Sequence, residues 1–403
     1  MRRALLPAWT GVLAALLVLG VTAPVEAAHL KRRGTETWDV AGAARITVTG
    51  HGYGHGHGMS QYGAEGAARQ GLTYQQIAEF YYPGTAWGTG GGRVTVQITG
   101  DTTPADLVVR SRPGLTLRDI GVPGRTALPD NGATSWRVMT GARGRSKVAY
   151  LTDRWRKWTT LTGRGEFAAG GAPITLVTPS GERAYRGRLR TAITTGGTRV
   201  TVNDLSLESY LKGVVPLEIP ALWSTEAVRA QAVAARTYAS YERAHPRSSA
   251  YQLCDTSSCQ VYGGYGAEHP AANQAVVATR KQILTSGGEA AFTQFGSSSG
   301  GWTSAGSVSY LSAREDPYDG WAGNPVHEWK LKLDDTALER AWPAIGDLTQ
   351  IAVTSRDGNG DWGGRVRSIT LTGSGGRVVV SGDTFRSVLG LRSTWLTFSV
   401  APR

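Results

Sequence analysis

The chain lacks several features that would assign it to a common protein class. After its first 28 residues it has no apolar run long enough to cross a bilayer. None of its Gly-rich stretches carries the Lys-Ser or Lys-Thr of a phosphate-binding loop, which argues against a nucleotide-binding function. No Gly-x-Ser-x-Gly with a paired histidine and acid is recognisable, and neither internal repeats nor low-complexity tracts are evident. These absences place the functional information in a few individual residues.

Cysteine is also scarce, with only Cys254 and Cys259 in 403 residues. An isolated pair in an exported chain most simply forms a disulfide that closes a short loop. The histidines of residues 51–57 have no acidic or cysteine ligand nearby, and the glycines between them would leave a metal site poorly organised. We therefore expect no metal at these histidines and no cofactor.

Acidic residues are fewer than basic ones. The chain has 43 Lys and Arg against 31 Asp and Glu, a formal net charge of +12. A basic exported protein suits anionic wall polymers or phospholipid surfaces. Because the basic residues are scattered, with no basic helix or aromatic nucleic-acid motif, we expect no nucleic acid among its partners.

The first 28 residues are typical of a secretory signal peptide. Met1–Arg3 supplies a positive start, Ala4–Val21 is apolar, and Val25–Ala28 is a cleavage region of small residues. We expect cleavage and export, and the alternative is an uncleaved membrane anchor.

The most informative segment is a Pro-rich turn at 214–220 that holds a single acid, Glu218, just before a strongly marked helix. Apolar neighbours and the prolines Pro216 and Pro220 predict a partly desolvated carboxyl group in a stiff loop. Such a group keeps its proton to higher pH, as a general acid working near neutrality requires. Ser224 is expected to cap the following helix. The alternative is a core helix with a tight entry turn.

Two segments here resemble the stage II sporulation protein D family, also called SpoIID/LytB. They are Leu-Ser-Leu-Glu-Ser-Tyr-Leu-Lys-Gly-Val-Val-Pro-Leu-Glu-Ile-Pro at 205–220 and Ala-Gln-Ala-Val-Ala-Ala-Arg-Thr-Tyr-Ala at 230–239. Residues 295–303 and 385–394 are also similar to the family. The resemblance implies a secreted, cell-wall-associated lytic transglycosylase that cuts peptidoglycan glycan strands between N-acetylmuramic acid and N-acetylglucosamine.

The resemblance also implies roles for individual residues. Glu218 falls on the family's catalytic glutamate, and Arg236 on an arginine associated with its active site. Paired hydrogen bonds from Arg236 to a sugar carboxylate would anchor substrate, and a surface salt bridge is the alternative. Some family members are expected to hold zinc at the cysteine pair, to which His245 would contribute here. The remaining expected substrate-binding residues are His55, Gln61, Gln231, Ser298 and Ser299.

A His/Gly-rich block at 51–64 also occurs in the resembled family, where it usually follows the segment that corresponds to 385–398. Here it comes first, which we interpret as a circular permutation. The strand at 46–48 should then pack beside the strand at 396–398, with His55 and Gln61 facing the Glu218 groove. The alternative is a separate wall-binding flap on a flexible Gly-rich linker at 88–92.

These patterns predict an α+β fold, a mixed catalytic domain with a β-rich module, apparently circularly permuted. The expected organisation is a signal peptide at 1–28, an N-terminal His/Gly-rich block packing on the catalytic domain at 29–87, a β-rich module at 88–190 and a SpoIID/LytB-like catalytic domain at 191–403. Short β segments are expected between 93 and 202, a hairpin at 365–380 and a short helix at 384–389.

Only one acid stands out, whereas hydrolytic glycosidases normally use two. A lytic transglycosylase can use one, which protonates the glycosidic oxygen and then takes the proton of the muramic acid 6-hydroxyl, leaving a 1,6-anhydro end. The alternative is a non-catalytic glycan-binding modifier or recruiter of another cell-wall hydrolase. The expected partners are therefore glycan strands and such hydrolases, in sporulation, division or general wall turnover.

Overall fold

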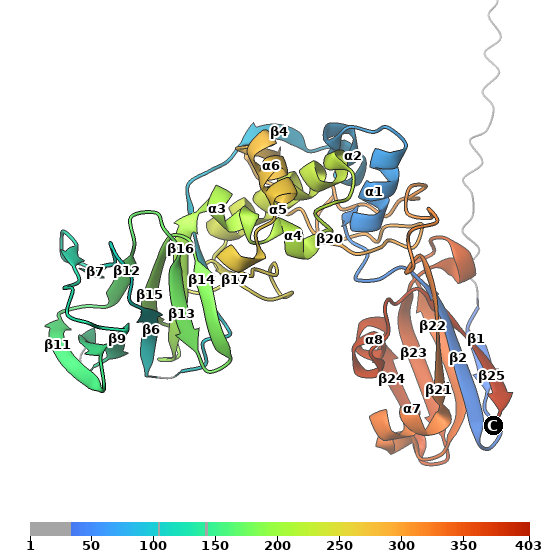
Figure 1. Cartoon of the computed structure of the whole chain (residues 1–403). Helices are drawn as coiled ribbons and strands as arrows, with labels where there is room; N and C mark the ends of the chain where they lie inside the picture. The colour runs from blue at the N-terminus through green and yellow to red at the C-terminus, as the bar shows by residue number, and fades with distance from the viewer. Residues whose placement is uncertain (1–33, 104, 142–143) are drawn as a thin grey trace, which may run out of the picture. The chain divides into compact units, whose positions relative to one another are not determined.

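The computed structural model describes residues 34–103, 105–141 and 144–403 (Figure 1). The predicted signal peptide lies outside these ranges. No helix within them is long and apolar enough to cross a membrane. The described chain combines helices with several sheets, so the α+β prediction is confirmed.

Two sheets make up the β-rich module (Figure 1). The six-stranded sheet has the order β11 (Trp155–Leu161), β10 (Ser146–Leu151), β9 (Ser135–Thr140), β6 (Asp106–Arg110), β13 (Ile174–Thr178) and β14 (Gly181–Tyr185). The seven-stranded sheet has the order β17 (Leu253–Cys254), β5 (Arg93–Gln97), β16 (Arg199–Ser206), β15 (Arg188–Ile193), β12 (Gly165–Ala168), β7 (Thr116–Asp119) and β8 (Thr126–Ala127). The second sheet runs across residue 190 and leads directly into the Glu218 segment.

Alternating apolar residues explain why these segments form strands. In β5, Val94 and Val96 are buried while the residues between and beside them are not. In β9, Trp136 and Val138 enter the core in the same way. The β segments expected between 93 and 202 are therefore confirmed.

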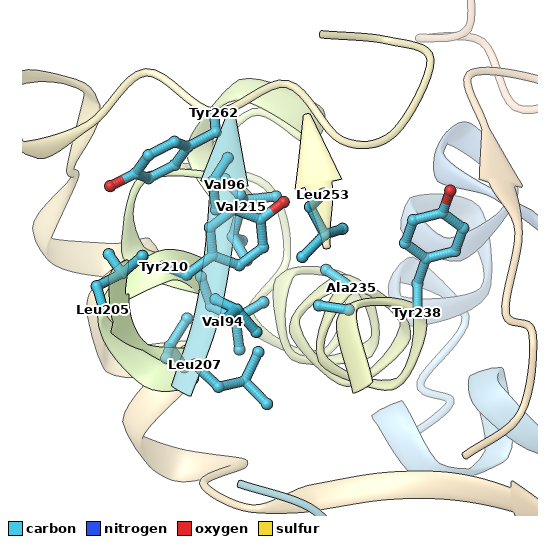
Figure 2. Packing of buried hydrophobic residues seen from close by; sticks show 14 of the residues in the cluster. Val94, Val96, Leu205, Leu207, Tyr210, Val215, Ala235, Tyr238, Leu253 and Tyr262 are labelled. Carbon is cyan, nitrogen blue, oxygen red and sulfur yellow. The ribbon is translucent and has the colours of Figure 1, made fainter. Parts of the chain in front are cut away.

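A helical layer follows the seven-stranded sheet. Its centre is α5 (Thr225–Ala244), whose many alanines permit close approach. Around it lie α1 (Gln61–Arg69), α2 (Tyr74–Tyr81), α3 (Leu207–Lys212), α4 (Val215–Glu218) and α6 (Pro270–Ala278), each in contact with α5. The apolar core between β5 and this layer includes Val94, Val96, Tyr210 and Val215 (Figure 2).

The C-terminal part has its own core and two sheets (Figure 1). One sheet has the order β1 (Glu36–Asp39), β22 (Leu348–Arg356), β23 (Val366–Gly373) and β24 (Gly376–Ser381), and the other the order β21 (Glu328–Asp334), β2 (Ala44–His51) and β25 (Leu396–Pro402). The short helices here are α7 (Asp335–Ala341), η3 (Pro343–Ile345), η4 (Asp361–Gly363) and α8 (Gly382–Leu389). The predicted hairpin and short helix correspond to β23–β24 and α8.

The N-terminal block is built into the rest of the chain. Strand β2 pairs with β25 from Ala44 to Gly50, with Val48 opposite Phe398, so the predicted pairing of these segments is confirmed. Strand β3 (Met59–Ser60) pairs in parallel with β20 (Phe295–Gly296). Gly58 has a φ of 67°, and a Cβ there would collide with the carbonyl oxygen of Gln294, so the glycine allows this close approach.

Two local predictions need correction. The predicted linker at 88–92 is partly the strand β4 (Ala86–Thr89), which pairs with β18 (Gln282–Ser286), itself beside β19 (Glu289–Ala290). The Pro-rich turn before the main helix is the short helix α4, because Pro216 fits the first turn of a helix, where no backbone donor is needed.

Candidate active site

Glu218 ends helix α4, and its side chain is only partly exposed. Its Oε1 accepts a hydrogen bond of 2.8 Å from the backbone N–H of Val261. The side-chain amide of Gln61 gives it a second hydrogen bond. Burial raises the pKa of Glu218, and these two hydrogen bonds only partly offset that rise. The site therefore holds a carboxyl group that favours its protonated form more than a solvated glutamate does.

A braced loop presents the Val261 amide. Just before it, the structure joins Cys254 and Cys259 in a disulfide. Just beyond the second cysteine, Gln260 accepts from the hydroxyl of Tyr210 at 3.1 Å and donates to the carbonyl of Ala235 at 3.2 Å. The disulfide and the two hydrogen bonds of Gln260 thus fix the loop, and so hold the Val261 N–H in place as a donor to Glu218.

Gln61 reaches Glu218 because helix α1 is anchored at its start. Ser60 caps this helix by accepting from the N–H of Gly63. Glu65, which is 1% exposed, accepts hydrogen bonds from both the backbone N–H and the hydroxyl of Ser224. Ser224 begins α5 as predicted, but its hydroxyl donates to Glu65 and does not cap the helix. The N-terminal block and the main helix are therefore locked together beside Glu218.

The environment of Arg236 argues against its predicted substrate contact. Its side chain is completely buried, and its guanidinium makes a bidentate pair with Glu208 at 3.0 and 2.9 Å. Its remaining donors reach the carbonyl of Val276 and the hydroxyl of Thr279. No face of this group is open to a sugar, so Arg236 joins α3, α5 and α6 as a structural residue. The alternative interpretation, a surface salt bridge, is instead an ion pair with a buried arginine.

Gln231 is also completely buried on α5. Neither of its amide atoms has a hydrogen-bond partner among the described residues. With no solvent-accessible surface, it does not form part of an open substrate groove, and the predicted sugar contact is not supported.

The environments of Ser298 and Ser299 likewise argue against their predicted sugar contacts. Both residues are buried, and their hydroxyls donate to Asp319 Oδ2 at 2.7 Å and Asp316 Oδ2 at 2.8 Å. Tyr81 donates to the same Asp316 oxygen at 2.9 Å, and Ser60 donates to Asp319 at 2.6 Å. These two aspartates and their donors form a buried polar cluster that links the N-terminal block to residues 298–327.

Sequence reasoning missed this cluster. His327 Nδ1 lies 2.9 Å from Asp319 Oδ2, and this bond raises the pKa of the histidine. Among the described residues no hydrogen bond joins Ser298 to His327, so serine, histidine and aspartate do not form a hydrolase triad here. The Asp-Pro-Tyr-Asp run at 316–319, with a histidine eight residues on, is the sequence signal that could have identified it.

His55 is not among the residues named above that hydrogen-bond Glu218. Its Nδ1 accepts from the N–H of His57 at 2.9 Å, and the backbone of Phe295 engages the ring as well. Burial, with the charges of His57 and nearby arginines, lowers the pKa of His55 to about 4. A neutral ring whose nitrogens are used inside the protein does not fit the predicted sugar contact.

Within the described ranges no group of three or more histidine, cysteine or acidic side chains is arranged to hold a metal ion. His245, the histidine named for the zinc alternative, stacks on Tyr241 at a ring-centroid distance of 4.2 Å. The cysteines are used in the disulfide.

The fold and site define a mixed α+β protein with one partly buried carboxyl group between a disulfide-braced loop and the N-terminal block. Residues 195–286 match the family model of stage II sporulation proteins, SpoIID. This match confirms the resemblance to the stage II sporulation protein D family over these residues.

Curated relatives extend this similarity. The chain is 38% identical over 140 residues to the amidase enhancer of Bacillus subtilis, covering 33% of this chain and 19% of that protein. It is 32% identical over 144 residues to stage II sporulation protein D of B. subtilis, covering 30% and 41%. For the protein of the same name from Bacillus amyloliquefaciens the identity is 31% over 217 residues, covering 48% and 60%. The chain thus spans between about one fifth and three fifths of the length of these relatives.

Proposed function

We propose that this chain is a lytic transglycosylase that cleaves peptidoglycan glycan strands, with Glu218 as its single acid and base. The observation that carries the proposal is the environment of this carboxyl group. It is buried enough for its pKa to be raised, yet partly exposed to an incoming substrate. An acid that keeps its proton towards neutral pH is what cleavage of a glycosidic bond requires.

The chemistry needs no second carboxylate. Glu218 gives its proton to the glycosidic oxygen as the bond from that oxygen to the anomeric carbon of N-acetylmuramic acid breaks. The 6-hydroxyl oxygen of the same sugar then bonds to the anomeric carbon, and its proton passes to the Glu218 carboxylate. The product is a 1,6-anhydro end, and Glu218 returns to its protonated form. The hydrogen bonds from Val261 and Gln61 stabilise the carboxylate between these two proton transfers.

The remaining residues of the site hold Glu218 and its two hydrogen-bond donors in position. The disulfide holds the loop that presents Val261, and Glu65 holds the helix that presents Gln61. Arg236 ties together the helices on which Glu218 rests. Substrate contacts are proposed for the open surface beside Glu218, where Leu217 and Leu222 are exposed.

We place this activity outside the cytoplasm, in a sporulation-linked role at the cell wall. The disulfide supports an oxidising compartment, and relatives named stage II sporulation protein D support the sporulation link. We also propose that the chain is a circular permutation of the family arrangement, with an N-terminal block, a β-rich module whose second sheet continues past residue 190, and a catalytic domain. The pairing of β2 with β25 supports this topology.

A second candidate function is that of a non-catalytic modifier of another wall hydrolase. It is favoured by the relative named amidase enhancer, to which the chain is 38% identical over 140 residues. In this case the protein would bind glycan or a hydrolase and leave the glycan strand intact.

The deciding experiment is mass spectrometry of purified glycan strands after incubation with the protein. The wild type should produce anhydro-ended fragments, and Glu218→Gln should not. Glu289→Gln is the matched control, because Glu289 is an exposed glutamate on β19. Reducing ends in place of anhydro ends would point to a hydrolase. No cleavage by the wild type, together with faster cleavage by an added amidase, would establish the second candidate.

A further inference from the structure

The positive charge of the chain is concentrated in the β-rich module. Residues 88–190 contain 17 Lys and Arg but only 7 Asp and Glu, so they carry most of the formal net charge of +12. The basic residues themselves are scattered along the sequence, but their excess over acidic residues is concentrated in this one module. The family match begins at residue 195, so it assigns no role to residues 88–190.

Within the module, the hairpin β10–β11 is rich in unpaired basic side chains. Lys147, Arg154 and Lys157 are exposed, and none of them has an ion-pair partner among the described residues. Arg156 is held by Thr152 and Asp153 at the turn of the hairpin. Strand β11 is the edge of the six-stranded sheet (Figure 1). Lys157 lies on this edge strand, Arg154 in the turn that leads into it, and Lys147 on the neighbouring strand β10.

A cavity of about 310 Å³ opens along the same strand. Trp158, Thr159 and Leu161 of β11 line it on one side. Leu117 and Asp119 of β7 and Thr126 of β8 line it on the other. It therefore lies where the edge of one sheet meets the edge of the other, and its volume is that of a small-molecule site.

The lining has the chemistry that sugars require. An indole ring packs against the apolar face of a sugar, while hydroxyl and carboxylate oxygens accept from its hydroxyl groups. The carboxylate of Asp119 is held in one orientation by hydrogen bonds from the backbone N–H groups of Thr162 and Gly163, at 2.8 and 2.9 Å. Because Asp119 is anionic, an acidic group of a ligand is expected at the basic side chains of the hairpin and not inside the cavity.

We propose that the β10–β11 hairpin and this cavity bind an acidic glycan, with a sugar ring in the cavity and its anionic groups on Lys147, Arg154 and Lys157. The cell wall as the source of this glycan rests on the proposed function. The shared chemistry is a saccharide chain that carries repeated negative charges, either phosphodiester or uronate. Such a site would hold the protein on the wall while Glu218 acts on a neighbouring strand.

Binding is tested with the full exported chain and four probes that contain no bond between N-acetylmuramic acid and N-acetylglucosamine. A glycosyl phosphodiester polymer and an oligogalacturonate represent the two acidic glycans. Polyphosphate supplies charge without sugar, and an N-acetylglucosamine oligomer supplies sugar without charge. At least one acidic glycan should bind about tenfold or more tightly than either of the other probes. Equal binding of polyphosphate or of the N-acetylglucosamine oligomer would overturn the proposal.

A charge-reversal pair locates the site. Arg154→Glu with Lys157→Glu should weaken acidic-glycan binding about tenfold or more and reduce its salt dependence. The matched control is Lys330→Glu with Lys332→Glu, which makes the same charge change at exposed positions of β21. Equal loss in both pairs would show that only net charge matters, and would overturn the proposal.

The cavity is tested by Thr126→Val with Thr159→Val, which removes two hydroxyls and suits strand positions. Acidic-glycan affinity should fall several-fold while polyphosphate affinity stays the same. No change would overturn the role of the cavity. Since none of the probes is a substrate for the proposed cleavage, failure of binding and failure of catalysis are read separately.

Discussion

Glu218 and Asp319 are both carboxyl groups with little access to water, yet their pKa values shift in opposite directions. Glu218 has two hydrogen-bond donors, and burial raises its pKa. Burial alone would also raise the pKa of Asp319, but hydrogen bonds from His327, Ser60 and Ser298 together hold it below the ordinary value. The donors of Asp319, which include His327, therefore keep this acid ionised, whereas the fewer donors of Glu218 leave it able to give a proton.

The two sites also differ in what they do for the fold. The donors of Asp319 come from the N-terminal block, from residues 298–300 and from residues 324–327, so its charge joins distant segments. Glu218 joins fewer groups and remains partly exposed. Residues that hold a structure together are expected to be fully paired, whereas a reactive acid is expected to be incompletely paired.

The largest expected effect is on catalysis at Glu218. Glu218→Gln should lower the rate of anhydro-product formation by roughly three to four orders of magnitude, because the group acts in both proton transfers. The same change should raise thermal stability at neutral pH. A raised folded-state pKa means that ionisation costs stability as pH rises above the unfolded pKa, and glutamine removes that cost.

Thermal unfolding of the wild type and Glu218→Gln at pH 7 and pH 4 checks the direction of this stability change. The stability gain should appear at pH 7 and shrink at pH 4, where the wild-type group is protonated. A stability loss at pH 7 would contradict the contrast with Asp319, and a rate within tenfold of wild type would contradict the catalytic role.

Asp319→Asn should have the next largest effect, on the free energy of unfolding. It removes the charge shared by the donors of the buried polar cluster, and a loss of about 3 kcal/mol is expected at neutral pH. Because the folded-state pKa of Asp319 is lowered, its contribution is present above the unfolded pKa and fades as pH falls. The difference between variant and wild type should therefore narrow in acid.

Denaturant unfolding measures this loss, and Asp130→Asn, at an exposed position, is its control. Equal stability of Asp319→Asn and the control would show that the polar cluster does not join the segments as described.

The comparison also explains what the sequence could reveal. Glu218 could be identified from the sequence because its apolar and proline neighbours are adjacent in the chain, so the local sequence predicts its burial. The cluster at Asp319 was not, because its donors are separated by as many as 259 residues from it and no local pattern brings them together. Likewise Arg236 was recognised as a special position, but only the packing of α3, α5 and α6 shows that it faces Glu208 and not a substrate.

Secondary structure followed local pattern more closely than residue roles did. The alternation in β5 and the alanine-rich run of α5 are local properties, and both elements form where predicted. The glycines at 88–92 misled because glycine permits free rotation but does not require it, and pairing with β18 fixes the first part of the segment.

Removal of the disulfide should have a smaller effect. Cys254→Ser with Cys259→Ser opens a loop of sequence separation 5, for which a loss of about 2 kcal/mol in the free energy of unfolding is expected. Activity should also fall, by less than tenfold, because the loop that presents Val261 to Glu218 becomes looser.

Denaturant unfolding measures the loss of stability, and the glycan assay measures the loss of activity. Intact mass before and after alkylation verifies the disulfide in the wild type. Two alkylated thiols in the untreated exported protein would contradict the pairing.

The smallest effect is expected for Gln61→Ala. This substitution tests the comparison of Glu218 with Asp319 most directly, because it removes one of the two hydrogen-bond donors to Glu218. The hydrogen bond from Gln61 favours the ionised carboxylate, so Gln61→Ala should raise the pKa of Glu218 further. An acid that must begin protonated loses activity as pH rises through its pKa, so the alkaline limb of the kcat/KM profile should move to higher pH. The rate at the optimum should fall by less than tenfold, because Val261 still holds the carboxylate. Gln70→Ala, at the exposed far end of the same helix, should leave the profile unchanged. A limb that moves to lower pH, or does not move, would show that Gln61 does not set the proton affinity of Glu218.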